Sequence, residues 1–435
     1  MKRFALERLK EWKEKPNRKP LIIRGARQVG KTWLMKEFGK TFFEKVAYVN
    51  FDSNTRMQQV FDGEINIERI VLAISAETGI SVNPENTLLI FDEVQEVPKA
   101  LSSLKYFCEN APEYAVVAAG SLLGVALHKG TSFPVGKVDF MDLYPLTFQE
   151  FLCALGEERF VEILRGKDTD MVTMFKSKYI DRLREYYFVG GMPEVVQTYV
   201  DTKDFNQVRE IQKNLLNYYQ QDFSKHAEIS LVPRLNLVWN SIPMQLAKEN
   251  KKYIYGQVRK GARAKDFELA IQWLLDCGLI HKVHRIEKPA LPLKAYMNLD
   301  IFKIYLLDVG LLMAMTGLNA QVIIDGNRIF TEFKGALTEQ YILQQLIAGE
   351  NVEPYYYSAE NSKGEIDFIL QGNTSVIPLE VKAEENLRAK SLKAFCEKYK
   401  LKYAVRTSMS DYREQEWMTN IPLYNIDRIG EYLRL

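Results

Sequence analysis

Short apolar runs alternate with helix-like stretches along residues 20–145. The runs are "PLIIR", "VAYVNFD", "NTLLIFDE" and "YAVVAAGS", and the stretches between them, such as "TWLMKEFGK", have helical periodicity. Short and continuously apolar runs are typical of strands that are buried on both faces of a parallel sheet. The alternation therefore predicts a doubly wound parallel α/β sheet.

The rest of the chain has three further patterns. Residues 151–230 read as helices with aromatic and charged faces, which we interpret as a helical lid. Residues 231–328 read as three helices followed by alternating strands, the order of a winged helix-turn-helix. Residues 329–435 begin with an amphipathic helix and continue as three strands, "EPYYYS", "EIDFIL" and "SVIPLEVKA". With residues 1–150 as the first domain, the pattern predicts four domains.

Composition sets broad limits on this interpretation. The chain has 435 residues, 47% of them hydrophobic and 26% charged, with a net charge of +2. This is an ordinary globular mixture, and a basic surface for nucleic acid must be local. No apolar run reaches the roughly 18 residues that a membrane span needs. The four cysteines are scattered without CxxC spacing, so we expect reduced thiols, no membrane partner and a cytoplasmic location.

The stretch "GARQVGKT" follows the first apolar run and fits the pattern G-x-x-x-x-G-K-[ST]. Its glycines allow a tight turn in which backbone N–H groups point at phosphate oxygens, and the next helix directs its N-terminus at the same charge. We expect Lys31 to reach the β- and γ-phosphates of ATP and the Thr32 hydroxyl to ligate Mg²⁺. The predicted ATP-binding loop consists of Gly25, Ala26, Arg27, Gln28, Val29, Gly30, Lys31 and Thr32.

Polar residues end the third and fourth apolar runs. Asp92 is expected to hold Mg²⁺ through water, and Glu93 to orient or deprotonate the attacking water. An acid pair that merely caps a helix is the alternative. Ser121 ends the fourth run, where it fits either a contact to the γ-phosphate or a helix N-cap.

These motifs resemble the AAA+ ATPases of the archaeal and bacterial group related to the STAND and Orc/Cdc6-like NTPases. The resemblance over residues 20–150 is carried by "GARQVGKT", "IFDEVQ", "AAGS" and "YPLTFQEFL", and "GGMPEVV" resembles the turn that opens a lid helix in that group. The family usually has Gly-Arg before the "PLTF" element, where this chain has Gly136 and Lys137. Arg182 and Arg184 are other candidates for an arginine finger.

A basic cluster surrounds the expected recognition helix of the winged helix. It includes Arg259, Lys260 and Arg263, which could contact nucleic-acid phosphates. The alternative is a solvated face on a winged helix that packs against protein. Lys251, Lys252 and Lys265 lie in the same cluster.

Acidic residues alternate with apolar ones on the C-terminal strands. Successive side chains of a strand point to opposite faces of the sheet, so Asp367 lies on the face opposite to that of its apolar neighbours. By the same alternation, Glu380 and Lys382 share one face. If the turn between these strands is centred between residues 373 and 374, Asp367 lies directly across from Glu380. Unpaired, the two acids would repel and raise one pKa. A salt-bridged outer sheet face is the alternative.

This arrangement resembles the core of PD-(D/E)XK nucleases. The resemblance implies that Asp367 and Glu380 hold a divalent ion, that Glu339 on the preceding helix joins them, and that Lys382 steadies the developing charge. The whole chain also resembles a family that combines an AAA+ ATPase, a winged helix and a C-terminal domain of unknown function with this core.

Together these patterns predict a cytoplasmic, ATP-hydrolysing AAA+-type protein that acts on or near nucleic acid. ATP and Mg²⁺ are the expected cofactors, DNA is a candidate partner, and a homo-oligomer is a candidate assembly. The first hypothesis is an ATP-gated, metal-dependent nuclease, which the acids favour. The second is an ATP-driven switch or scaffold whose C-terminal domain binds a partner without cleavage, which the near-zero net charge favours.

Overall fold

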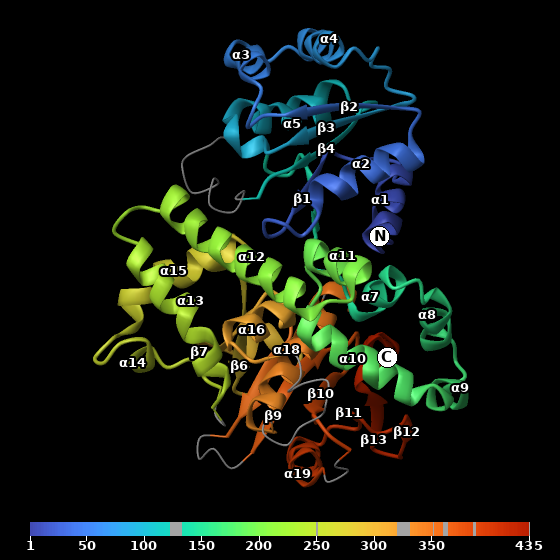
Figure 1. Cartoon of the computed structure of the whole chain (residues 1–435), viewed down its shortest axis with the longest axis vertical. Helices are drawn as coiled ribbons and strands as arrows, with labels where there is room; N and C mark the ends of the chain where they lie inside the picture. The colour runs from blue at the N-terminus through green and yellow to red at the C-terminus, as the bar shows by residue number, and fades with distance from the viewer. Residues whose placement is uncertain are drawn as a thin grey trace. The chain divides into compact units, whose positions relative to one another are not determined.

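The fold was analysed in a computed structural model of the chain (Figure 1). It describes residues 1–121, 133–248, 251–319, 331–350, 352–359, 364–385 and 389–434. These residues form two compact units. The first is Lys2–Tyr144 with Asp276–Leu279, and the second is Pro145–Leu275 with Ile280–Leu435 and Met1. The predicted domain boundary at residue 150 lies a few residues from this division.

The first unit contains a parallel sheet in the order β2-β3-β4-β1-β5, so the predicted doubly wound parallel sheet is confirmed. The strands are β1 Leu21–Arg24, β2 Lys45–Asn50, β3 Thr87–Asp92, β4 Ala115–Ala119 and β5 Asp139–Asp142. The helices are α1 Ala5–Glu14, α2 Lys31–Phe42, α3 Thr55–Asp62, α4 Ile67–Thr78, η1 Val94–Glu96 and α5 Pro98–Asn110. Strands β3 and β4 are buried along their whole length, as their continuous apolar runs require.

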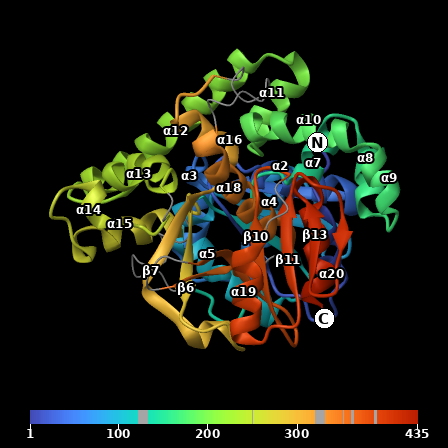
Figure 2. The same cartoon turned by 90° about the horizontal axis from the view of Figure 1, so that it is seen from below.

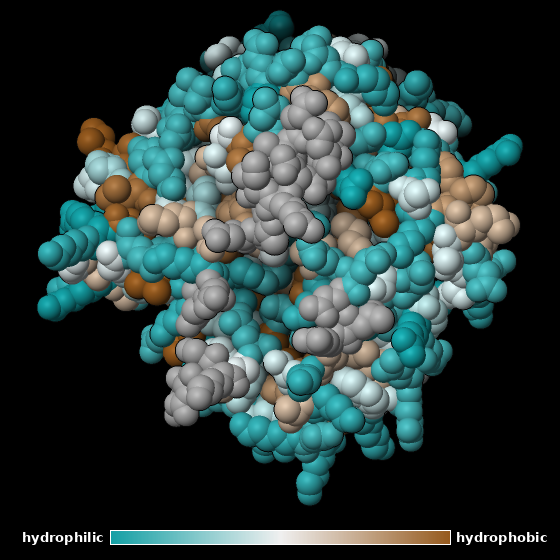
Figure 3. Space-filling model, turned by 60° about the horizontal axis from the view of Figure 1, so that its bottom comes forward, coloured by the Kyte–Doolittle hydropathy of each residue, from teal (hydrophilic) through white to brown (hydrophobic). Residues whose placement is uncertain are grey.

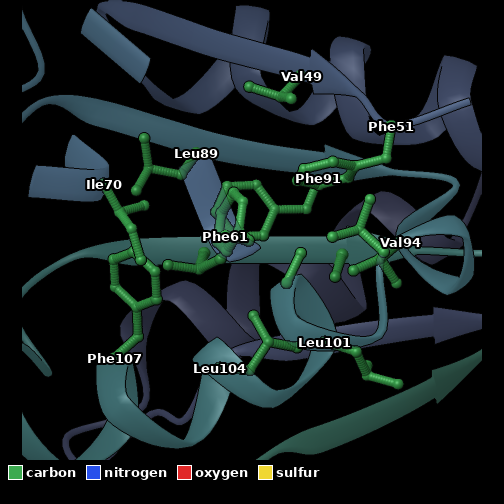
Figure 4. Packing of buried hydrophobic residues seen from close by; sticks show 14 of the residues in the cluster. Val49, Phe51, Phe61, Ile70, Leu89, Phe91, Val94, Leu101, Leu104 and Phe107 are labelled. Atoms are coloured by element: carbon green, nitrogen blue, oxygen red, sulfur yellow. The ribbon is translucent and has the colours of Figure 1, made fainter. Parts of the chain in front are cut away.

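Aliphatic and aromatic side chains together fill the core between this sheet and its helices (Figure 4). Phe51 packs edge to face on Phe61 and Phe91, with ring centroids 5.4 and 5.6 Å apart, and Phe91 packs on Phe107 at 6.0 Å. Each such pair contributes about 0.5–1.5 kcal/mol beyond simple burial. Phe91 directly precedes Asp92, so this packing holds the end of β3 where the predicted metal ligand begins.

The second unit begins with helices and continues into a mixed sheet. Its first helices are α7 Phe148–Ala154, α8 Glu158–Arg165, α9 Thr169–Met174, α10 Lys176–Val189, α11 Pro193–Thr202 and α12 Phe205–His226. The next are α13 Val232–Leu246, α14 Tyr255–Val258 and α15 Ala264–Asp276, followed by the antiparallel hairpin of β6 Ile280–Ile286 and β7 Met297–Leu306. This order is the one expected for a winged helix, which stays a prediction.

The remaining elements complete an eight-stranded sheet in the order β12-β13-β11-β10-β9-β8-β6-β7, part of which Figure 2 shows from below. The strands are β8 Tyr355–Ser358, β9 Glu365–Gln371, β10 Val376–Val381, β11 Ala404–Ser408, β12 Arg413–Glu414 and β13 Met418–Pro422. The helices are η2 Leu293–Tyr296, α16 Val309–Met315, α18 Thr331–Glu350, α19 Lys390–Tyr399, η4 Leu423–Arg428 and α20 Ile429–Leu433. Because β6 pairs with β8, the predicted boundary between residues 231–328 and 329–435 runs through one continuous sheet.

The "GGMPEVV" stretch forms a close contact between the helices of this unit. Gly190 ends α10 with a φ of 76°, and the backbone N–H of Gly191 donates to the Asp308 carboxylate at 2.6 Å. A Cβ on Gly191 would lie 2.2 Å from the carbonyl oxygen of Leu146. Only glycine permits this approach, and Pro193 then starts α11 in the first turn, as expected.

The outer surface matches the ordinary composition. In the face that Figure 3 shows, hydrophilic residues dominate and hydrophobic residues form small separate patches. None of the helices in the described part of the chain combines the length and the apolar character that a membrane span requires.

Candidate functional site

The loop between β1 and α2 has the backbone that its glycines predict. Gly25 has a φ of 146° and Gly30 a φ of 93°, and Gln28 also lies in the left-handed region at 69°. A Cβ on Gly25 would lie 2.2 Å from the carbonyl oxygen of Leu143, so a side chain cannot be placed there. Gly30 caps α2 without a side-chain hydrogen bond. The first N–H groups of α2 are therefore left for an anion.

Lys31 lies inside this loop and is only 7% exposed. Its ammonium group donates to the carbonyl oxygens of Gly25 at 2.9 Å and Ala26 at 2.8 Å. Burial lowers the pKa of Lys31 to about 8, while the charges of Glu93 and Asp92 oppose that shift. The cation is thus held by two backbone oxygens and faces the two acids at the end of β3.

Asp92 and Thr32 contact each other at the end of β3. The Thr32 hydroxyl donates to Asp92 Oδ2 at 2.7 Å, and the Tyr48 hydroxyl donates to the same oxygen at 2.9 Å. Burial and the Asp92 charge raise the pKa of Tyr48 to about 12, so Tyr48 remains a donor. A hydroxyl and a carboxylate beside a phosphate loop fit Mg²⁺, which needs few protein ligands when phosphates supply others.

Glu93 directly follows Asp92 and has a left-handed backbone, with φ 51° and ψ 43°. Gln95 Nε2 donates to its carboxylate at 2.7 Å, and the Ser121 hydroxyl donates to it at 3.0 Å. Burial alone would raise the pKa of Glu93, but the hydrogen bonds from Gln95 and Ser121 outweigh burial and lower it. Glu93 is therefore ionised, and the structure brings it together with Ser121.

Sequence reasoning missed Tyr48 and Gln95. Tyr48 is on β2 and has the same facing as Asn50, which pairs with Asp92 in the ladder. The alternation along β2 is visible in the sequence, but the adjacency of β2 and β3 is not. Gln95 is two residues from Glu93 in the 3₁₀ turn η1, and no pattern in the sequence distinguishes it from a surface glutamine.

The predicted register of the C-terminal strands is confirmed. Leu379 pairs with Phe368 and Pro378 with Ile369, so the next residues along the ladder, Glu380 and Asp367, are opposite each other. The backbone N–H of Val381 donates to Asp367 Oδ2 at 2.8 Å. Lys382 Nζ lies 3.1 Å from Glu380 Oε1, as their expected shared face requires.

The shared metal site of Glu339, Asp367 and Glu380 stays a prediction. Among the described residues, no three histidine, cysteine, aspartate or glutamate side chains are grouped so that they could hold a metal ion. Glu339 is ion-paired with Lys251 and Lys303. Lys251, which we expected in the basic cluster around the recognition helix, is therefore engaged by a carboxylate.

The predicted pKa rise occurs, but its cause differs from the expected one. The pKa of Asp367 is raised to about 7, first by burial and then by the charge of Glu339. Glu380, the neighbour that we expected to cause the rise, is paired with Lys382.

The basic residues near α15 separate into exposed and paired ones. Arg259, Lys260 and Arg263 are exposed.

Among the candidate arginine fingers, Arg182 Nη2 lies 2.6 Å from a carboxylate oxygen of Glu157, and Arg182 also forms an ion pair with Glu185. Arg184 lies 3.5 Å from Asp181, and Lys137 lies 2.9 Å from Glu109.

Comparison with known families assigns a class to the first unit. Residues 17–152 match the model of an AAA domain, residues 180–322 a domain of unknown function, DUF8612, and residues 334–426 another, DUF4143. With the loop geometry, the AAA match makes the N-terminal unit an AAA-type ATPase domain. No curated protein matches the chain at a significant level.

Several solved structures match part of the chain at low sequence identity. The Walker-type ATPase of Pyrococcus abyssi is 14% identical, with 72% of this chain and 95% of that chain covered and a TM-score of 0.45. The Aeropyrum pernix Orc1 protein in complex with DNA is 12% identical, with 72% and 91% covered and a TM-score of 0.27. Cdc6p of Pyrobaculum aerophilum is 12% identical, with 72% and 92% covered and a TM-score of 0.26.

Proposed function

We propose that this protein binds ATP with Mg²⁺ in the loop from Gly25 to Thr32 and hydrolyses it with Glu93 as the residue that activates water. The observation that carries the proposal is the contact of Thr32 with Asp92 at 2.7 Å, directly beside an ionised Glu93. Thr32 and Asp92 would hold Mg²⁺, which when bound neutralises phosphate charge.

The other residues of the site position these groups. Lys31 exchanges its two loop carbonyls for phosphate oxygens, which are stronger partners for a cation. Tyr48 orients Asp92 by donating to the carboxylate. Ser121 now donates to Glu93, and the same hydroxyl can turn to a γ-phosphate, which would leave the Glu93 carboxylate available for water. The proposed role of Ser121 is thus to donate its hydroxyl hydrogen bond to Glu93 without nucleotide and to the γ-phosphate when ATP is bound.

Two substitutions test this proposal through separate measurements of ATP binding and of phosphate release. Lys31→Ala is expected to lose ATP affinity because a cation on the β- and γ-phosphates is removed. Glu93→Gln is expected to bind ATP normally and to lose turnover by about 10²–10⁴-fold, the usual contribution of a general base.

Glu96→Gln is the matched control, since Glu96 lies in the same turn and is exposed. It should leave both binding and turnover unchanged. Equal loss of binding in Glu93→Gln and Lys31→Ala would mean that Glu93 is structural. Normal turnover in Glu93→Gln would place the base elsewhere.

We further propose that the protein acts on or near nucleic acid in the cytoplasm, with Arg259, Lys260 and Arg263 contacting phosphates. Their exposure and their place beside α15 support this. A homo-oligomer stays a prediction.

For the C-terminal region, the ion pairs of Glu339 with Lys251 and Lys303 favour a switch that binds a partner without cleavage. Incubation of the protein with DNA and with RNA in Mg²⁺ or Mn²⁺ tests this proposal. Cleavage products that appear with the native protein and are absent with Asp367→Asn would support the nuclease hypothesis instead.

A further inference from the structure

A cluster of buried and partly buried charges joins the hairpin β6–β7 to α18 and β9. Lys303 on β7 is fully buried, and its ammonium group forms an ion pair with Glu365 and lies 3.7 Å from Glu339 Oε2. Lys251 forms an ion pair with Glu339 Oε1, and the Tyr305 hydroxyl donates to Glu339 Oε2 at 3.1 Å. The cluster thus combines two cations with two carboxylates.

Every oxygen of Glu339 is already engaged within this cluster. Oε1 faces Lys251, and Oε2 faces both Tyr305 and Lys303. Burial alone would raise the pKa of Glu339, but the charges of Lys251 and Lys303 outweigh burial and lower it to about 2. The carboxylate is therefore ionised and held by cations of the chain itself.

We propose that Lys303 and Lys251 are the resident cations of this centre and stand in place of the divalent ion that its nuclease-like motif implies. The centre is then a structural one, which fastens the hairpin β6–β7 to the C-terminal helix and strands. Lys251, Lys303 and Tyr305 fall within residues 180–322, and Glu339 and Glu365 within residues 334–426. The two regions that match separate families are thus joined by one set of ion-paired charges.

Electrostatics explains why lysines exclude a metal ion here. A metal ion bound to Glu339 would have to separate it from Lys303, which would leave a fully buried ammonium with fewer partners. It would also lie within a few ångströms of two like charges, which repel strongly at low dielectric. The ammonium of Lys303 is further stabilised by the ring of Tyr356, whose centroid lies 4.7 Å away.

One oxygen nearby is not engaged. Glu380 Oε2 is buried without a hydrogen-bond partner, although Oε1 contacts Lys382 at 3.1 Å. If any divalent ion binds in this region, Glu380 and the opposite Asp367 are the residues that would hold it. A test of the proposal must therefore include both acids.

The first experiment titrates Mn²⁺ into the full-length, nucleotide-free protein and counts bound ions by electron paramagnetic resonance. An Asp92→Asn background removes the contribution of the ATP site. Asp367→Asn, Glu380→Gln and Glu339→Gln are each added to it, and we expect none of them to reduce the number of bound ions. A bound equivalent that disappears with any of the three substitutions would overturn the proposal.

The second experiment measures melting temperatures. Lys303→Met should lower the melting temperature by on the order of 5 °C or more, because the buried Glu339 and the partly exposed Glu365 lose a cation. Adding Glu339→Gln should recover part of that loss. Lys334→Met, at a partly exposed lysine that pairs with the exposed Glu384, is the control and should change little.

An unchanged melting temperature in Lys303→Met would refute the structural role. If Lys303→Met does not fold, Lys251→Met carries the same comparison, since its side chain is 13% exposed and contacts the same Glu339. These outcomes are independent of ATP turnover, so failure here and failure of the ATPase proposal can be told apart.

Discussion

Gly190→Ala isolates the energy of the close contact that the "GGMPEVV" stretch makes. Gly190 has a φ of 76°, and a Cβ at this position would lie 2.2 Å from Asp308 Oδ1. Gly156 offers a matched comparison, because its φ is 77° and its Cβ would meet nothing within 4 Å. Both glycines have a positive φ, and Gly190 also has a ψ of −164°, a combination that glycine alone adopts readily. Only the first substitution also forces Asp308 to move.

The magnitude follows from what holds Asp308. With φ 76° and ψ −164°, Gly190 has a backbone conformation that costs another residue about 1–3 kcal/mol. Asp308 is fully buried and accepts hydrogen bonds from the N–H groups of Gly191 at 2.6 Å and Leu311 at 3.0 Å. Displacing it adds about 1–3 kcal/mol for overpacking and about 1–3 kcal/mol for each donor left unsatisfied. We therefore expect Gly190→Ala to be less stable than Gly156→Ala by at least about 3 kcal/mol.

Differential scanning calorimetry of the full chain measures this difference, because the two compact units can unfold in separate transitions. At roughly 2 °C per kcal/mol for a unit of this size, the two variants should differ by about 6 °C in the transition of the second unit. Equal shifts would refute the reasoning, since they would show that Asp308 gives way without losing its hydrogen bonds.

Two further predictions concern pH and salt. Burial first, and the charge of Glu350 second, raise the pKa of Asp427 from 3.8 to about 7, so the folded chain holds this proton more tightly than the unfolded chain. The free energy of unfolding should therefore fall as pH rises from about 4 to about 7. In Asp427→Asn, melting curves at pH 5 and pH 8 should differ less than those of the native chain. An unchanged pH dependence would contradict the assignment. Replacing Arg259, Lys260 and Arg263 together should flatten the slope of log DNA affinity against log salt by about two to three, at roughly 0.9 per phosphate contact, and an unchanged slope would place the contact elsewhere.

The ATP site could be predicted from the sequence because its parts are local. A strand, a glycine loop and a helix follow one another within residues 21–42, and backbone geometry alone decides where the N–H groups point. Asp92 and Glu93 could be placed because an all-buried strand leads straight to them. Tyr48 and Gln95 could not, since their roles depend on which strands are adjacent and on a side-chain rotation within a turn.

The register of β9 and β10 was predictable for a related reason. A short turn between two antiparallel strands leaves few pairings, and each alternative would move the apolar residues to the wrong face. The strand pairing of β6 with β8 offers no such constraint, because Arg285 and Tyr356 are far apart in sequence and no short turn connects them. The sequence pattern therefore separates two regions whose strands belong to one sheet.

The charge cluster shows where motif reasoning reaches its limit. The sequence spacing predicts that Asp367, Glu380 and Lys382 share one face of the sheet, with Glu339 on the helix before them. The strand register and the contact of Lys382 with Glu380 agree with that shared face. A row of buried carboxylates needs cations, but the spacing does not say which cation supplies the charge. That choice is made by Lys251 and Lys303, which come from segments outside the motif. The same acidic pattern is therefore compatible with a metal centre and with an internal ion-pair network, and only the long-range partner distinguishes them.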